Sequence, residues 1–267
     1  MPEVDPLARN NVHITGNPDG RTIMFAHGFG GTQDSWRFVV PAFENDFRIV
    51  LFDQMGAGAS DLSLYDRAKY DSLYGYADDV LEIIEALDLH DVIYVGHSVA
   101  GMMGLLAANR RPELFSRLVL LGPSPRYIDA DGYAGGFSQA AIEDLLLSLD
   151  SNYLSFSATI GSVLMGNPER PELSESLTQI ISSQDQSITA QFARATFLSD
   201  NRRDLPDVTT PTLILQSYED NIAGPEVGEY VHQHIRGSEL RQMNSRGHVP
   251  NLSAPDEVSR HILEYLG

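Results

Sequence analysis

Ser98, Asp220 and His248 follow one another in this chain in an order typical of a catalytic triad. A serine hydroxyl becomes a nucleophile when a histidine takes its proton and a carboxylate orients that histidine. Serine, aspartate, histidine is one of the three chain orders known for such triads. The sequence therefore predicts nucleophilic catalysis at Ser98. A serine that merely caps a helix is the alternative.

The segments on either side of Ser98 support the catalytic interpretation. Residues 91–95 (DVIYV) are apolar and β-branched, as in a buried strand, and residues 102–109 (MMGLLAAN) are small and helix-forming. A tight turn between such a strand and helix holds a serine out at the carboxyl edge of a sheet. Ala100 replaces the last glycine of the usual G-x-S-x-G pattern, and alanine is small enough for that crowded turn.

Asp220 and His248 each lie in a loop that follows a predicted strand. Residues 212–216 precede the first loop and residues 239–243 the second. Ligand and catalytic groups of parallel sheets gather outside the carboxyl ends of the strands, so we expect these loops to meet at Ser98. Asp220 would orient His248, which would take the Ser98 proton; Glu219 is the competing carboxylate.

Two backbone N–H groups are expected to form the oxyanion hole. Val99 directly follows the nucleophile. Phe29 lies in the glycine-rich HGFGG segment after a predicted strand at 22–26, where glycines allow the backbone close to a substrate oxygen. A plain glycine-rich turn is the alternative for that segment. Loss of one such donor lowers turnover roughly a hundred- to a thousandfold.

Strand-like and helix-like segments alternate along most of the chain, which predicts an α/β fold with a mostly parallel, doubly wound sheet. Residues 74–87 form an amphipathic helix pattern, in which Asp78, Asp79, Glu82 and Glu85 are expected to face water. The predicted strands are 11–15, 22–26, 47–52, 91–95, 118–121, 212–216 and 239–243.

The alternation stops between residues 123 and 207, where only helical patterns occur. We expect a core formed by residues 1–122 and 208–267, with residues 123–207 inserted as a four-helix lid over the carboxyl edge of the sheet. Helices that simply extend the core are the alternative. The four helical segments are 138–149, 153–165, 171–182 and 187–198.

The charge of the chain limits the classes of partner that it is expected to bind. The 267 residues carry 37 acidic and 18 basic side chains, a formal charge of −19, which disfavours nucleic acid and anionic membranes. Lys69 is the only lysine; such a surface suits a salt-loving source, with ordinary solubility charge as the alternative. The start resembles no signal peptide and no apolar run would span a bilayer, so a cytoplasmic location is expected.

No metal or other cofactor is expected. The chain has no cysteine. His232 and His234 are two positions apart in a helical pattern, and residues at that spacing do not share a helix face. The triad chemistry itself requires no metal ion.

A series of motifs, in this order, resembles the α/β-hydrolases of the RsbQ type, which are bacterial stress-signalling hydrolases. The plant karrikin and strigolactone receptors are similar. The resemblance covers nearly the whole chain and implies an α/β-hydrolase fold, the triad Ser98, Asp220 and His248, and oxyanion donors at Phe29 and Val99. The motifs are HGFG, FDQMGAGAS, GHSVAGM, RPELFSRLVLLGPSPRY, GGF, ILQSYED and RGHVP.

The same resemblance implies a small apolar pocket under the lid. Phe137 and Phe197 match pocket aromatics, and Phe156 and Ile160 fall where relatives carry large pocket residues. Ile160 departs from the aromatic residue of the plant receptors, so their ligand preferences are not transferred to this chain. Packing within the lid is the alternative role for all four side chains.

Two classes of function follow from the sequence. The first is a serine hydrolase that cleaves a small apolar ester or lactone through an acyl-enzyme. The second is a signalling regulator of the RsbQ type, which binds or slowly hydrolyses a small ligand and engages a partner phosphatase. Carbon–carbon bond hydrolysis and perhydrolysis are further options on the same fold; dehalogenation is disfavoured, because Ser98 occupies the place of its carboxylate nucleophile.

Overall fold

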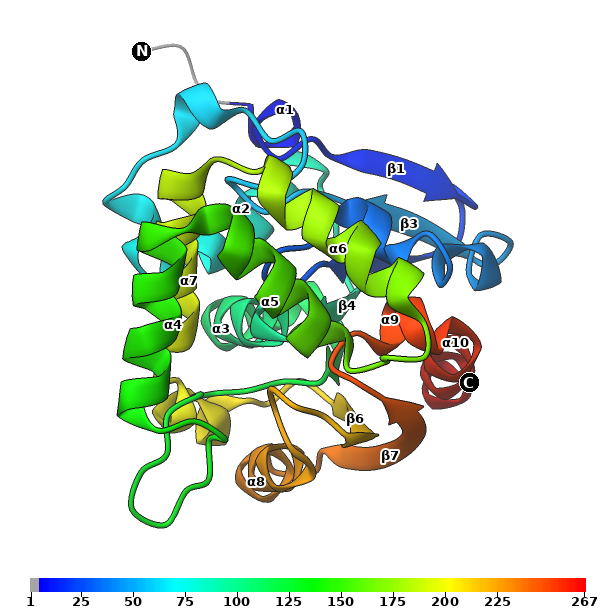
Figure 1. Cartoon of the computed structure of the whole chain (residues 1–267). Coiled ribbons are helices and arrows are strands. Elements are labelled where there is room, and N and C mark those ends of the chain that lie inside the picture. Colours follow the sequence, from blue (N-terminus) through cyan, green and yellow to red (C-terminus); the bar gives the residue numbers. More distant parts are fainter. Residues whose placement is uncertain (1–4) are drawn as a thin grey trace.

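A seven-stranded sheet forms the centre of the computed structural model, which describes residues 5–267 (Figure 1). The strand order is β1-β3-β2-β4-β5-β6-β7; only β1 is antiparallel to its neighbour. The predicted α/β class with a mostly parallel sheet is thus confirmed. The strands are β1 (His13–Gly16), β2 (Arg21–Ala26), β3 (Phe47–Leu51), β4 (Val92–His97), β5 (Phe115–Leu121), β6 (Thr212–Glu219) and β7 (Glu239–Arg246).

Burial separates the central strands from the edge. Every residue of β4 is buried, as expected of a parallel strand covered on both faces, whereas every residue of β1 is exposed. The predicted first strand started at residue 11. The observed strand starts at His13, because Asn11 has a φ of 46°, a left-handed conformation that interrupts extended structure.

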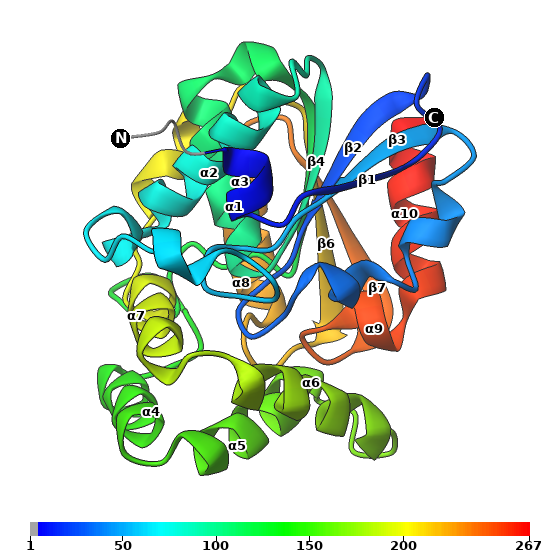
Figure 2. The same ribbon diagram turned by 90° about the horizontal axis from the view of Figure 1, so that it is seen from above.

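Helices cover both faces of the sheet (Figures 1 and 2). One face packs against α2 (Leu73–Ala86), α3 (Val99–Arg110) and α8 (Pro225–His234). The other packs against α10 (Pro255–Leu266) and two short 3-10 helices that include Trp36 and Val40. The sheet thus separates two apolar clusters, and the short helices α1 (Pro6–Arg9) and α9 (Pro250–Ser253) complete this part.

Four helices lie between β5 and β6 in the chain: α4 (Gln139–Ser151), α5 (Tyr153–Met165), α6 (Pro171–Ser183) and α7 (Gln186–Phe197). Figure 2 shows them grouped at one end of the molecule, beyond the tips of β6 and β7. Their starts have side-chain caps at Ser138, Asn152 and Asp185, and α5 ends at Gly166 with a φ of 61°. The four predicted helical segments closely match these bounds.

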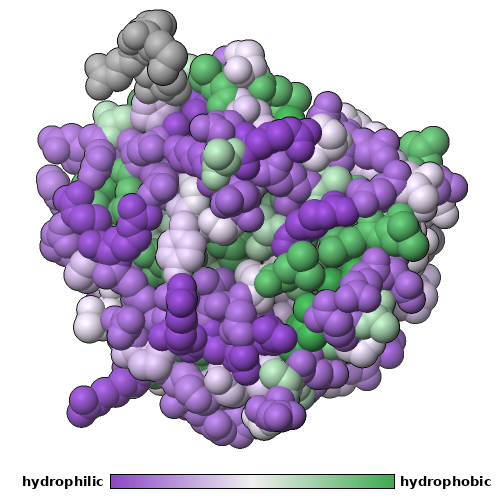
Figure 3. Space-filling view, turned by 90° about the vertical axis from the view of Figure 1, so that its left-hand side faces the viewer, coloured by the Kyte–Doolittle hydropathy of each residue, from purple (hydrophilic) through white to green (hydrophobic). Residues whose placement is uncertain are grey.

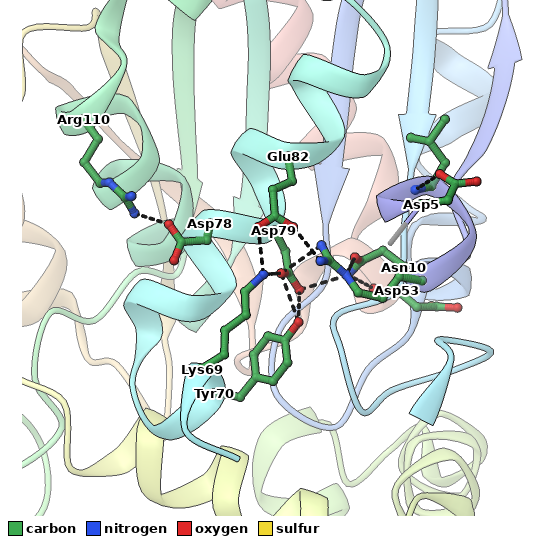
Figure 4. A network of polar contacts seen from close by, with 11 residues as sticks. Asp5, Asn10, Asp53, Lys69, Tyr70, Asp78, Asp79, Glu82 and Arg110 are labelled. Carbon is green, nitrogen blue, oxygen red and sulfur yellow. Dashed lines mark hydrogen bonds and ion pairs between the residues drawn. The ribbon is translucent and has the colours of Figure 1, made fainter. Parts of the chain in front are cut away.

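One surface prediction is wrong. Asp79 was expected to face water, yet its side chain is fully buried, because α1 and the 3-10 turn at Lys69–Asp71 cover that side of α2 (Figure 4). Its carboxylate contacts Arg9 at 2.9 Å, Lys69 at 2.7 Å and the Tyr70 hydroxyl at 3.0 Å. Burial raises the pKa of Asp79 even against these two cations. Asp78, Glu82 and Glu85 keep contact with solvent.

The face of the molecule shown in Figure 3 is mainly hydrophilic. On the face shown in Figure 3, polar residues cover most of the molecule and apolar residues gather in a few patches. In residues 5–267, no helix combines the length and apolarity needed to span a bilayer.

Candidate active site

Ser98 occupies a strained turn between β4 and α3. Its φ of 56° and ψ of −127° are unusual for a residue with a side chain, a form of strain that clusters at functional sites. A Cβ at Gly96 would lie 2.6 Å from the Ala100 carbonyl oxygen, so the turn requires glycine there. The Ser98 N–H donates to the Leu121 carbonyl at 2.8 Å and ties the turn to β5.

The structure brings the three predicted triad side chains into one hydrogen-bonded chain. The Ser98 hydroxyl lies 2.7 Å from Nε2 of His248, and Nδ1 of His248 lies 2.8 Å from Oδ2 of Asp220. The side chains come from the end of β4 and the loops after β7 and β6. All three are buried, so bulk water does not compete for these hydrogen bonds.

The surroundings of Asp220 keep it ionised. Burial alone would raise the pKa of its carboxyl, but His248 and the N–H groups of Ile222 and Ala223 hold that pKa below its usual value. An ionised carboxylate accepts a hydrogen bond from the Nδ1–H of His248 and leaves Nε2 free to act as a base. The competing carboxylate, Glu219, instead pairs with Arg246 at the surface.

His97 links the serine turn to the histidine loop. Its Nε2–H donates to the carbonyl of His248 at 2.7 Å, and burial lowers the pKa of His97 to about 3, so the ring stays neutral. The Tyr127 hydroxyl lies 3.5 Å from the Ser98 hydroxyl. Neither residue was among the site residues predicted from the sequence. Strand and helix patterns carried no signal for them, because their partners are distant in the chain.

The two backbone N–H groups predicted to form the oxyanion hole have no acceptor among residues 5–267, and their role stays a prediction. Val99 is the first residue of α3, where helical N–H groups lack an intrahelical partner. Within residues 5–267, neither the N–H of Val99 nor that of Phe29 donates to a protein acceptor. His27 fixes the loop that carries Phe29, since its Nδ1–H donates to Gly28 O and its Nε2 accepts the Gln54 N–H, both at 2.9 Å.

A small, mostly apolar cavity adjoins the Ser98 hydroxyl. The volume of this cavity is only about 20 Å³. Of the predicted pocket residues, Phe197 lines this cavity. Phe156 and Ile160 are buried in the apolar core, and Phe137 packs partly buried against it, so these three stay predictions. The other apolar side chains that line the cavity are those of Phe29, Tyr127, Leu164, Leu177, Ile222 and Val249.

Comparisons with known proteins agree with this fold. A family described as having the alpha/beta hydrolase fold matches residues 21–255. A probable esterase from Oryza sativa subsp. japonica is 37% identical over 258 residues, covering 96% of this chain and 95% of the relative. A karrikin insensitive receptor from Petunia hybrida is 35% identical over 258 residues, with the same two coverages. A solved hydrolase structure from Oleispira antarctica has a TM-score of 0.96 at 36% identity, covering 98% of this chain and 96% of that chain.

Proposed function

The chain belongs to the α/β hydrolase family, and we propose that it is a serine hydrolase that cleaves small apolar esters or lactones through an acyl-enzyme. The observation that carries the proposal is the hydrogen-bonded chain from Ser98 through His248 to Asp220. Ser98 and His248 line a cavity whose other lining residues are mainly apolar, and such a cavity suits an uncharged substrate.

The proposed reaction has two halves. His248 Nε2 takes the Ser98 proton as the hydroxyl oxygen attacks the carbonyl carbon, and the Phe29 and Val99 N–H groups stabilise the developing oxyanion. His248 then protonates the leaving oxygen, which leaves an ester on Ser98. In the second half His248 deprotonates a water molecule, and the water oxygen attacks that ester. The bond from the acyl carbon to the serine oxygen breaks, His248 returns the proton to Ser98, and the carboxylic acid product leaves.

We propose that residues 123–207 act as a lid over this site. Helices α5, α6 and α7 contribute Leu164, Leu177 and Phe197 to the cavity wall. Because the cavity is so small, a substrate would have to displace wall side chains, and these stand on helices outside the sheet. The lid would therefore set which acyl groups enter.

The test is covalent trapping of Ser98. A small alkyl fluorophosphonate should form an adduct at Ser98, detected by peptide mass spectrometry, and Ser98→Ala should abolish turnover of a p-nitrophenyl ester while the far-ultraviolet circular dichroism spectrum stays unchanged. Unchanged turnover in Ser98→Ala would remove the assignment. A screen of small esters and butenolides would then define the substrate.

The alternative is a receptor of the RsbQ type, in which ligand binding leads to contact with a partner phosphatase. The relative from Petunia hybrida is named a receptor, which supports retaining this alternative. Rapid, repeated turnover of a defined ester would favour the hydrolase. A single slow turnover, together with ligand-dependent phosphatase binding, would favour the receptor.

A further inference from the structure

We propose that the C-terminal turn of α5, residues 164–167, is a positioning element that holds His248 against Ser98, with Asn167 as its key side chain. We call these four residues the α5 turn. The inference rests on the proposed hydrolase function, because it concerns the base of that reaction. In Figure 1, α5 ends beside the loop that connects β7 to α9.

The α5 turn holds the backbone of the base directly. The N–H of His248 donates to the carbonyl of Leu164 at 2.9 Å. Carbonyls in the last turn of a helix lack intrahelical partners, so this one is available to the loop. The carbonyl of His248 accepts from His97 at 2.7 Å. The base is thus held by α5 on one side and by the serine turn on the other.

Asn167 adds a side-chain contact to the residue two positions before the base. Its Nδ2 donates to the carbonyl of Arg246 at 3.2 Å, and the side chain is buried. Gly247, between Arg246 and His248, packs directly on α5. A Cβ there would lie 1.8 Å from the Met165 carbonyl oxygen, and its φ is +87°. With no side chain between the two backbones, a shift of one must move the other.

The loop that carries Asp220 meets the same turn. The N–H of Gly247 donates to the carbonyl of Glu219 at 2.8 Å. A Cβ at Gly166 would lie 3.2 Å from the Asn221 amide nitrogen, so that side chain approaches the turn as well. The α5 turn therefore lies against both loops that supply the histidine and the carboxylate.

The same turn also reaches the cavity, because Leu164 lines it. A ligand that displaces Leu164 acts on the residue whose carbonyl binds the His248 N–H. Occupancy of the cavity and the position of the base are therefore linked through one helix end. Misplacement of a catalytic group by about 1 Å can cost roughly a hundredfold in rate.

Two matched substitutions at opposite ends of α5 test the proposal. Asn167→Ala removes the contact with Arg246. Asn152→Ala removes the N-terminal cap of the same helix, where the side chain accepts the Ser155 N–H at 3.1 Å. The measurement is the second-order rate of Ser98 labelling by a small alkyl fluorophosphonate, well below each variant's melting temperature. We expect about tenfold slower labelling for Asn167→Ala, and a change of about twofold or less for Asn152→Ala.

Further readouts separate positioning from general loosening of the helix. Asn167→Asp at pH 8 keeps the side-chain shape but lacks the N–H donor, so it should label as slowly as Asn167→Ala. Asn167→Ala should also alter the pH profile of labelling and weaken the downfield proton resonance of His248 Nδ1; Asn152→Ala should leave both unchanged.

Three results are distinguishable. If both alanine variants label equally fast, or if Asn167→Asp labels like the unmodified chain, the α5 turn does not position the base and the proposal is overturned. If the unmodified chain is not labelled at Ser98 at all, the hydrolase function itself fails. Slow labelling confined to the two Asn167 variants supports the proposal.

Discussion

The centre of the sheet around Ser98 and two helices of the insertion, α4 and α6, differ sharply in how deeply their residues are buried. Every residue of β4 is buried, and α3 buries all but its last two residues. By contrast, α4 buries only Ile142, Leu146 and Leu149, and α6 only Leu173, Leu177 and Ile181. The side chains proposed to react lie at the ends of the sheet strands, whereas Leu164, Leu177 and Phe197 of the cavity wall lie on helices of the insertion.

This difference has a physical basis in the sequence. The helix α3 is apolar and small on nearly all sides, because it packs between the sheet and its neighbours. The helices α4 and α6 carry one apolar stripe each and face water elsewhere. A helix held by one stripe opens at a lower free energy than an enclosed one. The comparison indicates that the residues proposed to react and the residues proposed to select the substrate can lie in parts of one chain that differ in rigidity.

The largest expected effect comes from the side chains proposed to react. Asp220→Asn should lower kcat by about 10⁴, because the amide no longer holds the His248 tautomer that accepts the serine proton. The loss should be equal for p-nitrophenyl esters of every chain length, measured under saturating substrate, with circular dichroism confirming the fold. A loss that varies strongly with chain length would contradict the separation of chemistry from selection.

Phe197→Ala should act on selection instead. Phe197 is buried, with ring centroids 5.5 Å from Phe29 and 5.1 Å from Tyr127, so truncation enlarges the cavity and costs about 3–5 kcal/mol of stability. Relative kcat/KM should shift toward longer acyl groups.

Phe115→Ala is the matched control for this prediction. Phe115 is also buried, but it lies at the start of β5, where its ring packs edge-on against Tyr94. It should lower stability by a similar amount without altering the chain-length preference. An equal shift in preference for both variants would show that general loosening, and not the cavity wall, determines selection.

Hydrogen exchange tests the difference in embedding directly. The opening free energy for amide exchange in α4 and α6 should be at least about 2 kcal/mol lower than that in β4 and α3. Exchange followed by mass spectrometry of peptic fragments would measure this. Equal protection in both parts would mean that the insertion unfolds only with the sheet.

The last prediction concerns pH, and its effect on stability is small near neutral pH and grows only in acid. Burial lowers the pKa of His97 from 6.5 to about 3, so the unfolded chain binds this proton more readily than the folded one. Its contribution to stability is complete above pH 6.5 and is lost as pH falls toward 3, with a slope of up to about 1.4 kcal/mol per pH unit. His97→Gln should flatten the dependence of the unfolding free energy on pH in that window. Urea titrations at several pH values would show this, and an unchanged slope would exclude His97 as its source.

Much of the fold was predictable because its signals are local. The run of strand, small-residue turn and helix around Ser98 identified the nucleophile candidate, and the parallel sheet then required the loops with Asp220 and His248 to lie at the same edge. The four helices of the insertion matched their predicted segments for the same reason: proline, glycine and capping residues mark their ends.

What sequence analysis missed depends on contacts between distant segments. The His97 ring binds the backbone of a residue 151 positions away, and no periodicity records that. Helical spacing placed Asp79 on a polar face of α2 but could not show that Arg9 and Lys69 cover it. Whether Phe156 and Ile160 reach the cavity depends on the rotation of α5, which only packing determines.

Lys69 is a site at which the protein could be chemically modified selectively. It is the only lysine, and its ammonium group is engaged by Asp79 and Glu82 with 23% of the side chain exposed. Amine-acylating reagents therefore have one side-chain amine to modify, and that amine must break two ion pairs before it can react. The acylation rate at Lys69 would report, without any engineered probe, how often the junction between α1 and α2 separates.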